Sequence, residues 1–444
     1  MAEKSPVGTP IQRAVRKFEK RWPSKMVLAA ALTLVVGLGV AACGGGSSST
    51  SSSSGSASTG NDAPGSEIVS ADGETVKTMT VTAVNSTTGA WPEAKYVAEA
   101  YASWVNAHGG IGGRELDMIF CDSEGTSAGL ARCAQKAVSE NVVAVVGGFL
   151  IDATAMTPVL EQAGIAWLGS PGVTPDEYTS KISFPTSGLF GWEAGGAYEA
   201  AKQGCKKLAI VGPDVPALEI TETISKNGFV AGGGDPSGFS VARYAPGATD
   251  LSTSAAEASR ESDCIYGYFP GPVMPVWLEA LKSVGATQRI VGYVGEITEE
   301  TATKFASQLE GSIASSAYQN YHTDPKWAAF REGLKEIEAP TTLDYGGPQG
   351  QETWVSYVQF NELASEIEGE LTAANFLEHA TEATKVDAPG LLPTLNFTEE
   401  YKGLNGEIPR NYNSYAAFGT FKNGVAILKP GFEDMGSVID GKAP

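Results

Sequence analysis

The sequence predicts an α/β fold with two doubly wound parallel-sheet lobes joined by a hinge. Apolar runs rich in β-branched residues alternate with helical patterns, which is typical of parallel sheets with right-handed crossovers. The alternating part, about residues 75–440, exceeds the size at which a single core stops growing. Four strand–helix units precede residue 186 and four more follow to about residue 310, which is enough for two sheets.

The first 42 residues have the pattern of a secretion signal. Residues 1–25 hold seven Lys/Arg against two Glu, and the 17 residues of 26–42 are uncharged and apolar. A basic region, a short apolar region and small residues before a cleavage site are typical of such signals. The run ends in VAAC at residues 40–43, which resembles a bacterial lipobox. The resemblance implies that Cys43 is acylated with diacylglycerol and becomes residue 1; a plain signal peptide or a signal anchor is the alternative.

A tether follows the signal and is expected to span residues 43–74. Residues 44–60 are almost wholly Gly and Ser, a composition that cannot bury apolar surface and behaves as a flexible coil. Two acyl chains anchor a protein stably where one does not. We therefore expect an extracytoplasmic protein held by its lipid on the outer face of the cell membrane.

Charge and composition exclude several functions. Removing residues 1–42 takes away seven Lys/Arg and two Asp/Glu, leaving 24 against 49 and a net charge near −25. Nucleic acid is therefore not an expected partner, because phosphate binding needs a basic surface. The three histidines, His108, His322 and His379, are scattered, and no CxxC spacing supports a metal site. No metal, no catalytic residue and no cofactor is predicted.

The elements follow one another in chain order. Apolar runs predict strands at residues 79–84, 116–120, 142–146, 165–168, 208–211, 264–269 and 290–294. Helical patterns lie between and after them, at residues 93–106, 128–139, 153–163, 273–284, 298–305, 325–337, 351–367 and 373–381. Residues 415–428 read as a hairpin with Asn-Gly at its turn. The glycines at 109–113 stand between a helix and a strand, whereas a nucleotide-binding loop needs strand, glycines and helix in that order.

Several segments carry a resemblance to a known family: Trp91, NAHGGIGGR at 106–114, Asp122, VGG at 146–148 and IAWLGSPGVTP at 165–175. In this order and spacing they resemble type I periplasmic binding proteins of the leucine/isoleucine/valine-binding class, which are solute receptors of ABC transporters. The resemblance continues through residues 265–274, 292–296, 354–357 and 412–417, and covers most of residues 78–435. It implies lobe 1 at 75–187 and 316–390, lobe 2 at 188–315 and 391–440, and a ligand cleft between them.

In lobe 1, the loops after the strands supply candidate ligand residues. Trp91 either forms an apolar wall for the ligand, as the resemblance implies, or packs as a hydrophobic staple. Asp152 either caps a helix at its start or lies beside amides that hold a ligand carboxylate. Ser170 and Thr174 belong to the loop that binds the ligand headgroup in the family; for Thr174 the alternative is a turn hydroxyl. Ile151 stands where the family's amino-acid binders have a Ser, and its side chain cannot hydrogen-bond.

In lobe 2, an acidic residue is the strongest candidate. Glu296 follows a strand and matches the family residue that pairs with a ligand ammonium; the alternative is a cap for the helix near Thr298. Of Tyr268 and Phe269, one is expected to face the cleft and the other the core. Gln351, or its neighbour Glu352, is expected to reach the cleft from the start of a helix.

The resemblance implies a receptor that binds, closes, docks on ABC permease subunits and releases a small solute. A monomer that is not an enzyme is expected. The ligand is expected to be a small amino-acid-like or related polar solute. Because Ile151 replaces a hydroxyl, an ordinary branched-chain amino acid is not assumed, and another amino acid, an amide, a small acid or a more apolar solute stays open. The alternatives are a lipid-anchored sensor and an α/β enzyme, although no G-x-S-x-G or HExxH motif occurs.

Four cysteines remain after Cys43, and an even number in an exported protein indicates disulfides. Four cysteines allow three pairings. Our hypothesis pairs Cys121 with Cys133 and Cys205 with Cys264, because this pairing keeps each bond within one lobe and leaves the hinge free.

Overall fold

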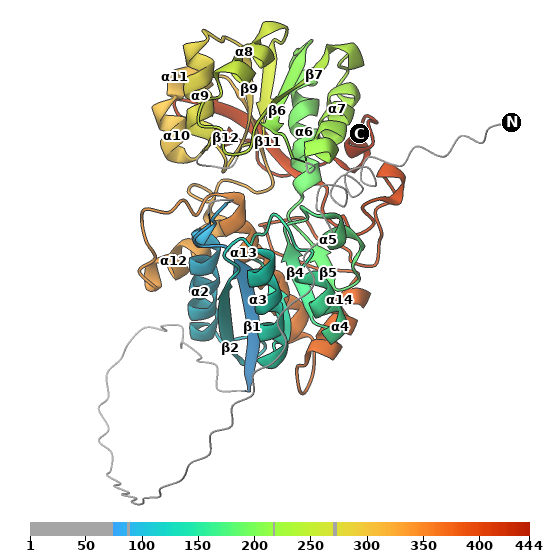
Figure 1. Cartoon of the computed structure of the whole chain (residues 1–444). Helices are drawn as coiled ribbons and strands as arrows, with labels where there is room; N and C mark the ends of the chain where they lie inside the picture. The colour runs from blue at the N-terminus through green and yellow to red at the C-terminus, as the bar shows by residue number, and fades with distance from the viewer. Residues whose placement is uncertain (1–73, 87–88, 216–217, 270–272) are drawn as a thin grey trace, which may run out of the picture.

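The computed structural model describes residues 74–86, 89–215, 218–269 and 273–444. Two sheets with their helices form two lobes (Figure 1). The first sheet is wholly parallel, in the order β2-β1-β3-β4-β5. Its strands are β1 (Thr75–Thr82), β2 (Glu115–Asp122), β3 (Ala144–Val146), β4 (Ala166–Ser170) and β5 (Ser183–Pro185). Its helices are α2 (Pro92–Ala107), α3 (Ser127–Ser139), α4 (Thr157–Ala163), α5 (Pro175–Thr179), α12 (Ala328–Glu336), α13 (Pro348–Ser365) and α14 (Ala373–Glu382).

The second sheet is mixed. It runs β12-β11-β10-β9-β8-β6-β7, with β13 on β11, and only β11 to β13 are antiparallel. Its strands are β6 (Leu208–Pro213), β7 (Phe239–Tyr244), β8 (Cys264–Gly267), β9 (Arg289–Tyr293), β10 (Ile313–Ser316), β11 (Tyr415–Lys422), β12 (Val425–Leu428) and β13 (Glu433–Asp434). Its helices are α6 (Leu189–Lys202), α7 (Leu218–Ala231), α8 (Ser252–Arg260), α9 (Met274–Ser283), α10 (Glu299–Lys304), α11 (Ala306–Leu309) and α15 (Gly436–Ile439).

Central strands such as β6 are buried on both sides because helices cover both faces of the sheet. In β6, Leu208 and Ile210 join the core beneath α6 and α7, whereas Ala209 and Val211 join the core beneath α8 and α9. This alternation follows from the two-residue period of a strand. The α/β fold with two sheet-based lobes confirms the predicted fold class.

The chain first crosses from one lobe to the other near Thr186 and last crosses near Asn413, and these two segments lie side by side. The amide of Asn413 donates from Nδ2 to the carbonyl of Thr186 at 2.8 Å. A Cβ on Gly191 would lie 2.4 Å from the carbonyl oxygen of Ser414, so only glycine permits this approach. A third crossing follows β10, a strand that packs on α6: the hydroxyl of Ser315 donates to the carbonyl of Trp192 at 2.9 Å. Three neighbouring crossings make a hinge.

Part of the chain after residue 391 contacts the first lobe. Val386 pairs with Leu395 in an isolated bridge, and the ring of Phe397 lies 5.0 Å from that of Phe184 in the first lobe. Arg410 donates from Nε to the carbonyl of Ser183 at 2.6 Å. We therefore propose that the last lobe boundary lies near residue 413, and we keep the other predicted boundaries.

Some elements differ from the sequence-based expectation. The strands β7 and β10 were not among the predicted ones, since half of the β7 side chains are polar or partly exposed and β10 is half serine. The helix expected from residue 153 begins at Thr157, after a turn. The hairpin turn is confirmed: Asn423 and Gly424 have φ values of 50° and 77°, as a tight hairpin of this kind requires.

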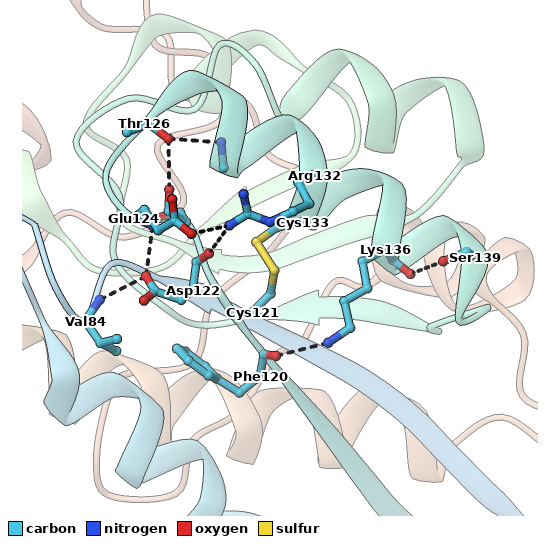
Figure 2. Close-up of a disulfide and its surroundings, with 12 residues drawn as sticks. Val84, Phe120, Cys121, Asp122, Glu124, Thr126, Arg132, Cys133, Lys136 and Ser139 are labelled. Atoms are coloured by element: carbon cyan, nitrogen blue, oxygen red, sulfur yellow. Dashed lines mark hydrogen bonds and ion pairs between the residues drawn. A yellow bond between two sulfur atoms is a disulfide. The ribbon is translucent and has the colours of Figure 1, made fainter. Parts of the chain in front are cut away.

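Both disulfides of the local pairing hypothesis are present. Cys121 is bonded to Cys133, and Cys205 to Cys264. Figure 2 shows the first bond joining the end of β2 to α3. Beside it, Arg132 donates to the carbonyl of Asp122 and pairs with Glu124, both at 3.0 Å. Each bond closes within one lobe and does not cross the hinge.

Within the described ranges, no helix combines the length and apolar character that crossing a bilayer requires. The predicted signal, Cys43 and the tether lie outside the described residues.

Removing the disulfide that closes the longer loop should destabilise the protein more than removing the other one, because the entropy of the unfolded chain grows with the logarithm of loop length. The bonds span 12 and 59 residues. The chain-entropy model gives about 3 kcal/mol for the shorter loop and about 4 kcal/mol for the longer. Urea unfolding of the Cys121→Ala/Cys133→Ala and Cys205→Ala/Cys264→Ala variants measures this difference. An equal or reversed order would contradict it.

Candidate functional site

Aromatic side chains line the ends of the first-lobe strands. Trp91 follows β1 and its ring lies 4.7 Å from the ring of Phe149, which follows β3. Both rings are partly buried. Gly148 lets the loop approach β1, because a Cβ there would lie 2.1 Å from the carbonyl oxygen of Val81. Trp91 occupies the cap position of α2 and packs on Phe149, an arrangement that suits an apolar wall.

The loop after β4 is closed around a carboxyl group of the protein itself. Glu177 accepts hydrogen bonds from the amides of Gly172, Val173 and Thr174 at 2.7, 3.1 and 2.8 Å. The hydroxyl of Thr174 donates to the same carboxylate at 2.9 Å. Burial raises the pKa of Glu177 to about 7, although these hydrogen bonds lower it. The Thr174 hydroxyl, for which the sequence left open a ligand contact or a turn role, is thus engaged within its own turn.

The other first-lobe candidates are also engaged or exposed. Ser170 is fully buried and its hydroxyl lies 2.9 Å from that of Ser183. Asp152 accepts from the amide and hydroxyl of Thr154 at 2.9 and 2.7 Å, so it closes a turn ahead of α4. Ile151 is 47% exposed. The polar side-chain atoms of Ser170 and Asp152 therefore already have partners within the protein.

In the second lobe, the paired aromatics point to opposite sides of the sheet. Phe269 stacks on Tyr244 and Trp277 within one core cluster. Tyr268 lies on the other side, where its hydroxyl meets that of Ser225 at 2.6 Å. Both rings are buried, and Tyr268 is the one on the side of α6.

Glu296 occupies the loop after β9, and it does not cap the next helix. Thr298 fills that role, accepting from the amide of Thr301 at 3.2 Å. The Oε2 atom of Glu296 is buried without a hydrogen-bond partner. Burial raises the pKa of Glu296 well above its usual range; the amide of Phe269 lowers it, and the carboxyl of Glu193 raises it further.

Two further carboxyl groups are buried on helices that pack near the sheet ends. Glu193 on α6 is 4% exposed, and Glu352 on α13 is 1% exposed. Glu193 Oε2 and Glu352 Oε1 have no hydrogen-bond partner. Burial raises the pKa of Glu193 to about 8, while the hydroxyl of Thr221 lowers it. Burial, and then the carboxyl of Glu177, raise the pKa of Glu352 well above its usual range.

These carboxyl groups come from separate elements, but they raise the pKa of the same tyrosine side chains. We use the name acidic cluster for Glu177, Glu193, Glu296 and Glu352. After burial, the carboxyls of Glu296, Glu352 and Glu193 all raise the pKa of Tyr293. Three of the four likewise raise the pKa of Tyr178. Among the described residues, no Lys, Arg or His forms an ion pair with any member of the cluster.

Close packing brings α13 to this region. A Cβ on Gly295 would lie 2.5 Å from Cδ of Pro348, the first residue of α13, so the Glu296 loop touches the helix start. Against the first sheet, a Cβ on Gly169 would lie 1.8 Å from Oγ of Ser356. Glu352 is one turn before Ser356 and lies between these two contacts along the helix. The sequence analysis named Glu352 only as an alternative to Gln351. It did not name Glu193, which could have been noticed as a charged residue within an apolar, glycine-rich helical segment.

Gln351 lies beside a different hollow. It donates from Nε2 to the carbonyl of Gln319 at 2.9 Å and lines a space of about 450 Å³ that Asp344 and Tyr321 also border. A larger hollow of about 1260 Å³ lies between residues 319–326, 390–393 and 425–432. Of the predicted site residues, Gln351 is the one that borders either of these hollows in the described part of the chain.

Metal chemistry has little support in this geometry. Cys205, Asp263 and Cys264 place their ligand atoms within 4.8 Å of one another, and the search for such groups covers only the described residues. Both cysteines are in a disulfide, so they offer no thiolate.

Buried carboxyl groups should make ligand-free stability depend on pH. The pKa of Glu193 rises from 4.5 to about 8, so between these values the native state keeps a proton that the unfolded chain releases. The free energy of unfolding therefore falls as pH rises through this window, by on the order of 1.4 kcal/mol per unit of raised pKa. Glu193→Gln should reduce this fall between pH 5 and pH 8, measured by urea unfolding. Identical slopes in both proteins would contradict the assignment.

Comparisons with known proteins agree with this architecture. The family model described as periplasmic binding protein matches residues 67–408. An extracellular ligand-binding receptor from Verminephrobacter eiseniae has a similar structure at 17% identity and a TM-score of 0.63, with 80% of this chain and 99% of that chain covered. A leucine-binding protein, LivK, from Thermotoga maritima shows 16% identity and a TM-score of 0.61, with 81% and 99% covered.

A third similar structure is a solute-binding protein of an ABC transporter from R. palustris, in complex with benzoate. It shows 16% identity and a TM-score of 0.62, with 80% of this chain and 96% of that chain covered. No curated protein sequence matches the chain. The family match extends over most of the chain, and the similar structures share its two-lobed fold. The chain belongs to the periplasmic binding protein family, whose members are solute-binding receptors and not enzymes.

Proposed function

We propose that the chain is an extracytoplasmic lipoprotein of an ABC importer that captures a small amino-acid-like or related polar solute between its lobes. The observation that carries this proposal is the acidic cluster, whose members come from α5, α6, α13 and the loop after β9. These elements belong to both lobes. A ligand bound there would touch both lobes at once, so its binding energy would favour the closed arrangement.

Delivery to permease subunits follows from membership of the family. Similar structures include receptors described with benzoate and with isoleucine, so the family fold accepts ligands of different chemistry. The ligand of this chain must therefore be inferred from its own side chains. A lipid-anchored sensor would use the same cleft, and neighbouring genes for a permease and ATPases would favour transport.

A solute that binds in the cleft should be detectable directly. Mass spectrometry of the protein purified without denaturation should identify a retained solute, and a thermal-shift panel should confirm it. A ligand at about 100 times its Kd stabilises the native state by ~2.7 kcal/mol. If no solute is retained and no small polar compound shifts the melting temperature, the receptor proposal loses its support.

Glu296→Ala should abolish ligand binding while the fold persists. A ligand ammonium would supply the partner that Glu296 Oε2 lacks, and it would favour the charged carboxylate. Calorimetric titration with the retained solute measures the loss. Glu300→Ala is the matched control, since Glu300 is exposed in the adjoining helix. Unchanged affinity in Glu296→Ala would remove Glu296 from the site.

Lipid anchoring depends on a residue outside the described ranges and is tested separately. Cys43→Ala should move the protein from the membrane fraction to the soluble fraction and abolish labelling with radioactive fatty acid. The tether and the receptor domain should be unaffected, because the predicted acylation involves Cys43 alone. Continued membrane association of the variant would instead support a signal anchor.

A further inference from the structure

The third crossing between the lobes begins with residues that are bound to the second lobe. Gln319 donates from Nε2 to the carbonyl of Gly431 at 2.6 Å, and Asn320 donates from Nδ2 to the carbonyl of Ala426 at 3.4 Å. Both carbonyls belong to the antiparallel end of the second sheet, since Ala426 lies on β12 and Gly431 lies between β12 and β13. The side chains up to Asn320 therefore fasten the chain to the second lobe.

One residue later, the chain is fastened to the first lobe. Arg331 on α12 donates to the carbonyls of Tyr321 and Asp324. The ring of Tyr321 meets that of Phe330, on the same helix, edge to face with 5.5 Å between centroids. It also lies against the loop before α13, because a Cβ on Gly346 would lie 2.5 Å from its Cε1 atom. The change of lobe on this crossing thus falls between Asn320 and Tyr321.

His322 follows this point and reaches back across it. Its Nε2 atom lies 2.9 Å from Oε1 of Glu299, the first residue of α10 in the second lobe (Figure 1). Its ring lies 3.8 Å from the ring of Tyr321, and its amide donates to Oδ1 of Asn320 at 2.9 Å. The imidazole is therefore held beside first-lobe contacts, whereas its ring nitrogen contacts a second-lobe carboxylate. A rotation of the lobes about residues 320–321 changes the distance between the two groups.

This contact borders an open space rather than a packed core. Glu299 and His322 line the hollow of about 450 Å³, together with Asp344 and Gln351 from the first lobe. The side chain of His322 is 35% exposed and that of Glu299 is 58% exposed. Two polar groups that face such a space can separate without leaving a buried polar atom unpaired.

Neighbouring charges keep the attraction between the two groups moderate. Burial, and then the guanidinium of Arg331, lower the pKa of His322. Burial, and then the carboxyl of Asp344, raise the pKa of Glu299. Both shifts favour the uncharged forms of these side chains, so the contact is weaker than an isolated ion pair. A contact of moderate strength can form and break as the lobes move, whereas a strong one would hold a single arrangement.

We propose that His322 and Glu299 form a clasp across the hinge, which stabilises the lobe arrangement of this structure and is released when the lobes leave that arrangement. The clasp acts on the equilibrium between lobe arrangements, and a solute that favours a different arrangement must bind it well enough to overcome the clasp. Both groups belong to the protein, so the inference depends neither on which solute binds nor on whether transport or sensing follows.

Distance measurements between the lobes test the clasp without a ligand. Nitroxide labels on Gln135→Cys and Lys282→Cys, exposed positions of α3 in the first lobe and α9 in the second, report the distance distribution by double electron–electron resonance. His322→Phe keeps a ring but lacks the ring nitrogen, and Glu299→Ala lacks the carboxylate. Each should lower the ratio of the main wild-type population to all others about two- to fivefold, the range that partly exposed pairs produce. The double variant should show no larger shift than either single variant, because both changes remove one contact.

Glu300→Ala is the matched control, because Glu300 is the second acidic residue in the first turn of α10 and is exposed. Its distance distribution should equal that of the labelled wild-type sequence. Unchanged distributions in His322→Phe and Glu299→Ala, or shifts that add in the double variant, would overturn the clasp. Melting curves show that each variant is folded, so a shift reports on the lobe arrangement.

Adding the solute retained on purification, or an active compound from the thermal-shift panel, separates the clasp from the receptor function. If the solute changes the wild-type distances and the clasp variants match the wild type without it, the receptor function stands and the clasp fails. If the clasp variants shift but no solute is retained and no compound alters the wild-type distances, the clasp stands and the receptor function loses its support.

Discussion

The covering of both sheets by helices is the constraint on which the rest of this structure depends. A parallel strand buried on both faces has no room for an unpaired polar side chain, so polar groups gather where the strands end. In β6 every interior position is apolar. In the loop after β9, by contrast, Glu296 keeps a buried oxygen without a partner. Placing the strand ends of two lobes near one another produces the candidate site.

Close backbone contacts then determine which side chains enter that site. Gly169 and Gly147 let α13 approach the first sheet, since a Cβ on either would overlap Ser356 or Thr353. This approach carries Glu352, on the same helix, into the buried region. The hydroxyl of Tyr357 meets those of Thr78 and Thr80 at 3.2 and 2.8 Å and fixes the helix on β1. Small residues in the sheet thus position a charged residue on the helix.

Desolvation of the acidic cluster links stability, pH and ligand chemistry. Four carboxyl groups removed from water favour their protonated forms, and a bound cation would favour the charged forms instead. The side-by-side crossings at Thr186 and Asn413 lie close to α6, which carries Glu193. Neutralising charge between the lobes would therefore also favour closure of the hinge that α6 adjoins.

The sequence by itself determined the layered α/β architecture and the hairpin at Asn423-Gly424, because these depend on local periodicity and turn chemistry. It allowed three cysteine pairings, and the structure decided between them. It also indicated the strand-end loops and Glu296. The bond between Thr174 and Glu177 is also local, because these residues form a capping box. Only the tertiary structure decided which buried carboxyl oxygens are free: Thr221 donates to one oxygen of Glu193, and the other has no partner. Residues far apart in the chain surround Glu193, and no local pattern in the sequence encodes those contacts.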